Sequence, residues 1–276
     1  MEQGERAFRP LSVSDLIDET FRVFRRHFLL FVKIGAVLMI PIGLIEIIQQ
    51  IAVHQHPDDL EFNLLTSGLV GLVRAIVYLA VLAAIIYTMS EIRMGRQPTV
   101  GDAYNDGMER FLSIIWIAFL YALLPGLIAI TIIGVPFAIY LGLAWIFGLH
   151  AAVIEGKRGM AALSRSRSLV KGHWWRVLGI YLLISIIVAI ISVIFSAPNV
   201  VLSAMLALGR DGETFRILGS VVSVIFSTAG TIITGPIIYI ASVLLYYDLR
   251  ARKEGLDLEM VANQTETMAR SAYPQM

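Results

Sequence analysis

Residues 111–154 read FLSIIWIAFLYALLPGLIAITIIGVPFAIYLGLAWIFGLHAAVI and contain no Asp, Glu, Lys or Arg. A helix needs about 20 apolar residues to cross the hydrocarbon core of a bilayer, so this run is long enough to cross twice. Near its midpoint, Ile133-Gly134-Val135-Pro136 combines glycine with proline, which is typical of a tight turn. The run therefore predicts two membrane-spanning helices joined as a hairpin.

Two apolar runs precede this hairpin. Ile34–Ile51 is interrupted only by Glu46, and Leu69–Ser90 only by Arg74. Both runs are long enough for a tilted crossing. We expect them to form the first hairpin.

Two apolar runs follow it. Val177–Gly209 holds one crossing, and we expect its helix to end near Pro198, with a short apolar segment continuing along the membrane surface. Ile217–Tyr247 would be about 46 Å long as a straight helix, which exceeds the core, so we expect it to tilt or to bend at Gly235-Pro236. The sequence predicts an all-α polytopic membrane protein with six transmembrane helices in three hairpins.

The composition agrees with a membrane protein. Hydrophobic residues make up 57% of the chain and charged residues 16%, and the mean hydropathy is +0.76, which is too apolar for a soluble domain. The absence of cysteine excludes disulfides, thiolate metal sites and iron–sulfur clusters. The net charge of +1 gives no indication of nucleic-acid binding. No removable signal peptide is evident, so we expect the first span to direct insertion.

The distribution of Lys and Arg between the connections predicts the orientation of the chain in the membrane. If the termini and the second and fourth connections share one side, only Arg74, Arg210 and Arg216 of the 22 Lys and Arg residues lie on the other. Basic residues favour the cytoplasmic side. We expect a cytoplasmic (inner) membrane protein with both termini in the cytoplasm, residues 256–276 forming a flexible tail.

An approximate repeat divides the single integral membrane domain, residues 1–276, into 11–97, 98–158 and 159–255. Ser12-Val13-Ser14-Asp15 and Thr99-Val100-Gly101-Asp102 each have the spacing of a helix N-terminal capping box. A third helix is expected from Leu163 to Trp174. We expect each of these to be a cytoplasmic amphipathic interfacial helix that leads into a hairpin.

The basic residues of these helices are candidate contacts for anionic lipid. The candidates are Arg22, Arg25, Arg26, Arg165, Arg167 and Lys171. The alternative is that the helices line a cytoplasmic site for a ligand or a protein partner.

Charged residues inside spans are costly and are candidates for function. Glu46 and Arg74 are expected at similar depth in the first hairpin, where they would form an intramembrane ion pair or serve a transport or ligand role. The first outer loop holds two histidines and three carboxylates at positions 54–61, which are suitable ligand types for a divalent ion. Their spacing matches no closed metal site, so we expect a solvated loop.

Small residues recur every fourth position in the last span. They are Gly219, Ser223, Ser227, Thr231 and Gly235. Such a stripe permits close helix packing, within the bundle or between protomers; the alternative is a polar lining for a substrate path. Proline at positions 41, 125, 136 and 236 breaks or borders four spans, as in some transporters.

Three segments carry a family resemblance. Residues 244–258 read LLYYDLRARKEGLDL, residues 8–18 open as FRPLSVSDLID, and residues 169–176 read LVKGHWWR. Together they resemble the membrane domain of glycerophosphoryl diester phosphodiesterases. The resemblance implies a membrane domain of the kind that, in that family, is fused to a soluble barrel domain that performs the hydrolysis. The motifs of that barrel are absent from this chain. No functional residue is therefore carried over.

No nucleophile elbow, phosphate-binding loop, zinc-protease motif or dinucleotide fingerprint occurs in the sequence. We expect a non-catalytic membrane protein, with no cofactor or metal, that organises or accompanies lipids, other membrane proteins or further copies of itself. The alternative is a transporter or channel for a small or lipid-like solute. A lipid-modifying enzyme would need a water-accessible cluster of acids or histidines at one face.

Overall fold

A computed structural model describes residues 11–209 and 212–254. Every regular element in these two ranges is an α-helix, and six helices are long and apolar enough to cross a membrane, as the sequence predicts. The predicted tail 256–276 lies outside the described residues, as does Arg210. The helices are α2 (Val13–Arg26), α3 (Phe28–Gln55), α4 (Leu60–Arg93), α5 (Val100–Glu109), α6 (Phe111–Ala129), α7 (Gly134–Trp145), α8 (Gly148–Glu155), α9 (Gly159–Val170), α10 (Trp174–Ala207) and α11 (Glu213–Glu254).

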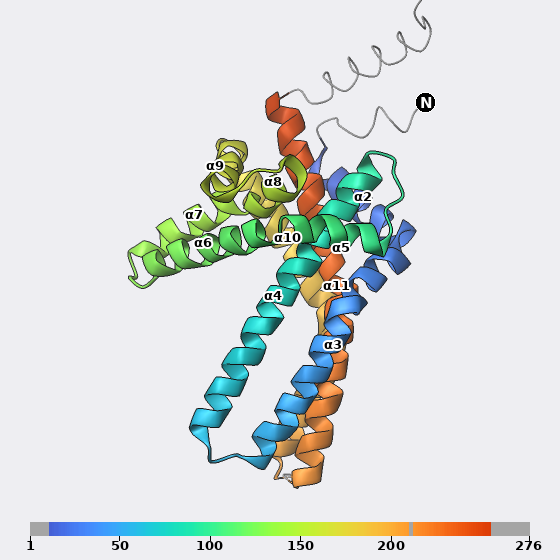
Figure 1. Ribbon diagram of the computed structural model, residues 1–276, viewed down its shortest axis with the longest axis vertical. Coiled ribbons are helices and arrows are strands. Elements are labelled where there is room, and N and C mark those ends of the chain that lie inside the picture. The colour runs from blue at the N-terminus through green and yellow to red at the C-terminus, as the bar shows by residue number, and fades with distance from the viewer. Residues whose placement is uncertain (1–10, 210–211, 255–276) are drawn as a thin grey trace, which may run out of the picture.

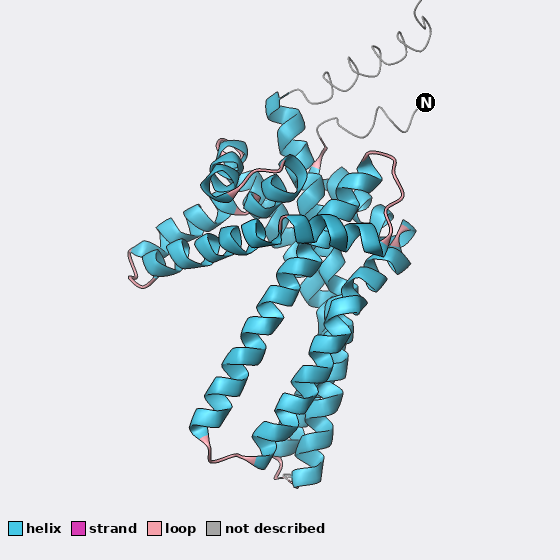
Figure 2. Cartoon of the chain, viewed as in Figure 1, coloured by secondary structure: helices cyan, strands magenta, loops and turns pink. Residues whose placement is uncertain are grey.

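The four longest helices, α3, α4, α10 and α11, run along the long axis of the molecule (Figure 1). At one end, which we call the near end, they meet the short helices α2, α5, α8 and α9, and α11 reaches its C-terminus. At the opposite, far end lie the loop between α3 and α4, the C-terminal end of α10 and the N-terminal end of α11. Figure 2 shows that the connections between helices are short. The α6–α7 hairpin projects sideways from the near end instead of lying parallel to the long helices.

The helix of the fifth span does not end at Pro198, contrary to expectation. α10 continues through this proline to Ala207, and α11 likewise continues through Pro236. A proline removes one backbone hydrogen bond. In an apolar surrounding, unwinding the chain would expose many more unsatisfied backbone groups. The continuous helix is therefore the less costly arrangement.

The fourth span is interrupted, whereas its uncharged sequence predicts one continuous helix. α7 ends at Trp145 and α8 begins at Gly148. Ser166 of α9 lies beside the break: its hydroxyl accepts a hydrogen bond from the Phe147 N–H at 3.0 Å and donates one to the Ala144 carbonyl at 2.8 Å. The serine is fully buried, and it satisfies backbone groups that the broken helix leaves open.

The turn between α6 and α7 lies near its predicted place. It occupies residues 130–133, and Pro136 falls in the first turn of α7, where a proline needs no backbone donor. A Cβ atom on Gly134 would lie 1.8 Å from the carbonyl oxygen of Ile128. This closeness requires glycine at the start of α7.

The two predicted capping boxes are present. The Ser12 hydroxyl accepts from the Asp15 N–H at 3.0 Å, and the Asp15 carboxylate accepts from the Ser12 N–H at 3.1 Å. Thr99 and Asp102 make the same exchange, and the hydrogen bonds from Thr99 lower the pKa of Asp102. The third helix, α9, differs from its expected bounds, since it begins at Gly159 and ends at Val170. No side-chain hydrogen bond caps its start.

α11 packs closely against α10 and α3. A Cβ on Gly230 would lie 2.7 Å from Cβ of Phe195 in α10, and one on Gly43 of α3 would lie 2.9 Å from the Thr228 hydroxyl. Gly35 of α3 lies against Ile232. Small residues on facing helices therefore set the distance between these helix axes.

We predict that Gly230→Leu destabilises the protein, because the new side chain would push α10 away from α11. Overpacking of this kind lowers the free energy of unfolding by about 1–3 kcal/mol. The measurement is the thermal unfolding midpoint in detergent. The control is Gly179→Leu in α10, where a Cβ meets nothing within 4 Å; equal loss in both variants would contradict the packing argument.

Candidate functional site: a polar network at the near end

The last turns of α11 connect five other parts of the chain. Residues 246–254 read YYDLRARKE, and their polar side chains contact the segment before α2 and helices α4, α8, α9 and α10. The apolar residues between them, such as Leu249, are buried in the core. This short stretch therefore joins α11 to the segment before α2 and to four other helices at the near end.

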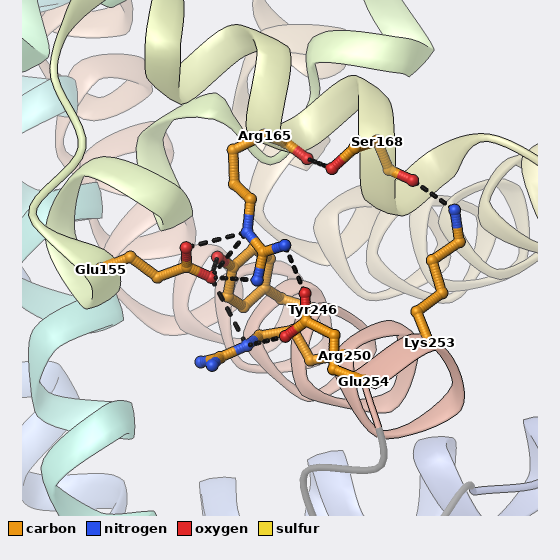
Figure 3. A network of polar contacts seen from close by, with 7 residues as sticks. All are labelled: Glu155, Arg165, Ser168, Tyr246, Arg250, Lys253 and Glu254. Atoms are coloured by element: carbon orange, nitrogen blue, oxygen red, sulfur yellow. Dashed lines mark hydrogen bonds and ion pairs between the residues drawn. The ribbon is translucent and has the colours of Figure 1, made fainter.

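Glu155, the last residue of α8, is the principal acceptor of the network (Figure 3). Arg165 of α9 donates to its two carboxylate oxygens from Nε at 3.0 and 2.8 Å and from Nη2 at 2.9 Å. The Tyr246 hydroxyl donates to Oε1 at 2.5 Å, and Arg250 Nε lies 3.4 Å from the same oxygen. The carboxylate is thus engaged by groups from two different helices.

Glu254 pairs with the same two arginines. Arg165 Nη1 is bound to Glu254, and Arg250 Nε lies 3.3 Å from its Oε2. The Glu254 hydrogen bond and the Glu155 carboxylate raise the pKa of Arg165. Two carboxylates and two guanidinium groups therefore form a charge-balanced cluster between α8, α9 and α11. Lys253 adds a bond to the Ser168 carbonyl of α9.

Asp248 forms a second cluster on the same helix. Its side chain has no exposed surface. It accepts the Leu11 N–H at 2.7 Å, Arg176 Nε of α10 at 3.1 Å and Arg252 Nε at 3.0 Å. Both arginines also donate to the Leu11 carbonyl, at 2.6 and 2.8 Å. This cluster fixes the chain before α2 to α10 and α11.

Tyr247 extends the network to α4. Its hydroxyl lies 2.8 Å from the Ser90 hydroxyl, and the Arg93 guanidinium carbon lies 4.9 Å from its ring centroid. On α4, Glu91 also binds Arg96 at 2.9 Å. The acid that closes each even-numbered span, at positions 91, 155 and 248, is thus paired with arginine in every case.

A buried histidine lies on α8 five residues before Glu155. His150 of α8 is buried, with its Nε2 hydrogen-bonded to Ser242 of α11, and its Nδ1 has no partner among the described residues. The Tyr181 hydroxyl of α10 donates to Ser242 at 2.9 Å. These three residues line part of an otherwise apolar cavity of about 300 Å³ between α4, α6, α8, α10 and α11.

The predicted pair in the first hairpin is brought together at the far end. Arg74 Nη1 lies 3.4 Å from Glu46 Oε1. Both residues border a polar cavity of about 770 Å³ between α3, α4, α10 and α11. Three members of the small-residue stripe face the same interior: Ser223 and Ser227 line this cavity, and Gly219 contacts Leu202 of α10.

Thr231 and Gly235, the other two members of the stripe, line a void of about 10 Å³ further along α11. The members of the stripe therefore point toward α3, α4 and α10, although Ser227 stays exposed where the cavity opens.

The candidate lipid contacts fall into two groups. Arg165 is turned into the network, whereas the other five residues are exposed at the near end, with Arg22 3.1 Å from Glu19. The exposed residues are Arg22, Arg25, Arg26, Arg167 and Lys171.

The histidines and acids of the first loop do not converge. Among the residues that the structure describes, no group of three or more His, Cys, Asp or Glu could hold a metal ion. Asp59 instead caps α4 by accepting the Phe62 N–H at 2.9 Å, and His54 Nδ1 lies 2.6 Å from the Gln50 carbonyl oxygen. His27 ends α2, where burial and Arg26 lower its pKa.

Comparison with known families points to the same part of the chain. Residues 111–272 match the family model described as the membrane domain of glycerophosphoryl diester phosphodiesterase. The chain belongs to this family. The match confirms the resemblance and includes residues 169–176 and 244–254, which supply Arg176 and most of the network, but not residues 8–18. No curated protein and no solved structure matches the chain.

Residues 169–176 and 244–258 supply much of the network, but their sequences do not indicate that these side chains meet one another or Glu155. The repeated acid at the end of each even-numbered span was the available signal, since a charge at a membrane boundary favours a partner of opposite sign. Some partners are four residues apart, but others are 91 to 241 residues apart in the sequence, and sequence spacing alone does not predict contacts over such separations.

We predict that Glu155→Gln destabilises the near end, because it leaves Arg165 and Arg250 with less opposite charge. Because the pair is only partly buried, we expect a cost between the about 1 kcal/mol of an exposed ion pair and the about 3 kcal/mol of a buried one. The readouts are the thermal unfolding midpoint and the rate of proteolysis after α8. Glu61→Gln, at an exposed position of α4, is the matched control. A Glu155 variant as stable as this control would show that the network contributes little.

Proposed function

We propose that this family member is a non-catalytic protein of the cytoplasmic membrane that organises anionic lipids, or proteins that accompany them, at its near end. The observation that carries the proposal is a set of exposed basic side chains on α2 and at the end of α9, namely Arg22, Arg25, Arg26, Arg167 and Lys171.

The packing of α2 supports this proposal. Its residues Leu16, Thr20 and Val23 are buried, and the helix packs against α11. The arginines therefore project from the opposite side, away from the protein. Next to them, Phe28 at the start of α3 is 37% exposed, and Trp175 at the start of α10 is 78% exposed. Aromatic and basic residues at the ends of spans favour the interface between headgroups and acyl chains.

The near end faces the cytoplasm in this proposal. The support is the bias of Lys and Arg, since the exposed basic residues above lie there and Arg74 and Arg216 lie toward the far end. Each of the units 11–97, 98–158 and 159–255 supplies one interfacial helix, α2, α5 or α9, followed by one hairpin. The charge-balanced network then serves to join these units instead of acting on a substrate.

The network favours a structural role over catalysis. Glu155, Glu254 and Asp248 each accept from at least one arginine within the protein, so each carboxylate is engaged in an internal ion pair. A catalytic acid or base must reach the substrate proton directly or through one water. Carboxylates held in this way are better suited to fixing helices in place.

A transporter is the second candidate, favoured by the polar cavity of about 770 Å³ at the far end. One layer deeper, the space lined by Gly35, Tyr78 and Thr231 measures about 10 Å³. Transport would require this layer to open. Flux of a labelled solute into proteoliposomes would support the transporter over the organising role.

We predict that replacing Arg22, Arg25 and Arg26 together with Gln reduces retention of phosphatidylglycerol. Each basic residue near an anionic surface contributes about 1 kcal/mol, so the triple variant should lose most of the lipid bound at this site. Native mass spectrometry after purification in mixed lipid measures the effect. The matched control replaces the same three residues with Lys and should retain lipid; unchanged lipid occupancy in the Gln variant would remove the proposal.

We also predict the orientation from single cysteines, since the chain contains no cysteine of its own. Asp58→Cys at the far end and Lys157→Cys at the near end are both exposed positions. A membrane-impermeant maleimide should label Asp58→Cys in intact cells and Lys157→Cys only after permeabilisation. The reverse pattern would place the near end outside.

A further inference from the structure

The α6–α7 hairpin does not follow the direction expected of two membrane-spanning helices. It projects sideways from the near end, whereas α3, α4, α10 and α11 follow the long axis (Figure 1). α6 has 19 residues, which makes it about 28 Å long, close to the roughly 30 Å thickness of the hydrocarbon core. A helix of this length crosses the core only when it lies nearly parallel to the membrane normal, so a large tilt leaves its tip inside the bilayer.

Contacts with α10 give the direction of α7. The Tyr140 ring of α7 lies 6.5 Å from the ring of Trp174, the first residue of α10. Further along both segments, the Phe147 ring lies 6.1 Å from the Tyr181 ring. The two pairs follow the same order, so the chain from α7 into α8 runs in the direction in which α10 leaves the near end. A fourth span that returned to the near end before the fifth began would run the opposite way, with the pairs in reverse order.

The tip of the hairpin therefore lies close to the level at which α10 begins. Trp174 marks this level, and the neighbouring Trp175 is 78% exposed, as is usual for tryptophan at the interface between headgroups and acyl chains. From Tyr140 to Gly134, where α7 starts, the distance along the helix is about 9 Å. This distance cannot carry the turn through a core roughly 30 Å thick.

The turn at the tip is also unusually apolar. Residues 130–133 read ITII, and Ile132 is 91% exposed. Turns in water are usually polar, as is the loop between α3 and α4, which contains Asp58. Backbone groups in an apolar medium need partners within the protein, and the Thr131 hydroxyl supplies one by accepting the Gly134 N–H at 3.0 Å. The turn is thus suited to an apolar surrounding.

Apolar side chains are exposed on every side of the distal part of the hairpin. Residues 126–133 are all exposed, as are residues 135–137, and residues 111–154 carry no charge. A helix that is apolar on all sides needs an apolar medium around it. A protein partner would cover one face, whereas lipid acyl chains surround the whole surface. Acyl chains are therefore the occupant that this exposure favours.

Helix α9 covers the proximal part of the hairpin. Ala162 and Leu163 of α9 are buried in one cluster with Ile117 of α6 and Ala144 of α7, and Arg167 of α9 is exposed. An amphipathic helix at a membrane surface turns its apolar side toward the acyl chains. The hairpin lies on this apolar side of α9, as a hairpin within the same leaflet would.

We propose that the α6–α7 hairpin does not cross the bilayer but lies within the leaflet at the near end, where its exposed surface binds phospholipid acyl chains. Four helices, α3, α4, α10 and α11, then cross the membrane. The proposed function enters only in naming this leaflet as the cytoplasmic one. There the hairpin contacts the acyl chains of the lipids whose headgroups the exposed basic residues attract, so the protein binds both parts of an anionic lipid.

The position of the tip is tested with a short Gly-Ser segment that contains one cysteine, inserted between Thr131 and Ile132. Its labelling by a membrane-impermeant maleimide, in intact and in permeabilised cells, is compared with that of Asp58→Cys at the far end and Lys157→Cys at the near end. We expect the segment to label under the same condition as Lys157→Cys. A segment that labels in neither condition also supports the proposal, because it places the tip inside the bilayer. Labelling under the same condition as Asp58→Cys would overturn the proposal.

Contact with acyl chains is tested by fluorescence quenching, since the chain contains no cysteine of its own. Bimane is attached to Ile132→Cys in the full chain, in phosphatidylcholine nanodiscs that contain a lipid with a nitroxide on its acyl chain. This lipid should reduce the emission several-fold. The control, Lys157→Cys at an exposed near-end position, should be quenched only weakly.

Quenching at Ile132→Cys no stronger than at the control would overturn the lipid contact. So would efficient disulfide formation between two Ile132→Cys chains, which would show a second copy at this surface. Replacing Arg22, Arg25 and Arg26 with Gln should leave both measurements unchanged. The labelling compares the tip with both ends of the molecule, so its result does not depend on which end faces the cytoplasm. Failure of this proposal and failure of the organising role are therefore distinguishable.

Discussion

The buried carboxylate of Asp248 has to be compensated, and the way it is compensated determines how the near end is built. A charge removed from water is tolerated only with opposite charges and hydrogen bonds around it. Here they come from Arg176 of α10, Arg252 of α11 and the backbone of Leu11. The N-terminal segment, the fifth span and the sixth span are consequently held at one point. The cluster of Glu155, Arg165, Arg250 and Glu254 adds α8 and α9 to it.

Backbone N–H and C=O groups that are removed from water also need hydrogen-bond partners. Where the fourth span breaks between α7 and α8, the Ser166 side chain of a neighbouring helix satisfies the Ala144 carbonyl and the Phe147 N–H. Where Pro198 and Pro236 remove donors, the helices stay intact. A break is thus found where another element supplies partners, and a proline alone does not produce one.

The number of long apolar helices could be predicted from the sequence because hydropathy is a local property, and the two capping boxes could be predicted because their partners are three residues apart. The helix through Pro198 and the break at residues 146–147 could not, since both depend on what neighbouring helices supply. For the candidate site, the sequence supplied Glu46 and Arg74 as a pair at similar depth. It gave no indication that Arg165 would turn inward to Glu155 and Glu254, because the near-end network joins residues up to 241 positions apart.

α11 is a single helix of 42 residues that lines the polar cavity with Ser223 at one end and carries Glu254 at the other. The two residues are about 46 Å apart along the helix axis. A helix resists compression along its axis, so displacing its wall of the cavity must either bend it or shift the near end. A displacement at the cavity would therefore either bend α11 at Pro236, where one backbone hydrogen bond is missing, or reach the ion pairs that join α11 to α8, α9 and α10.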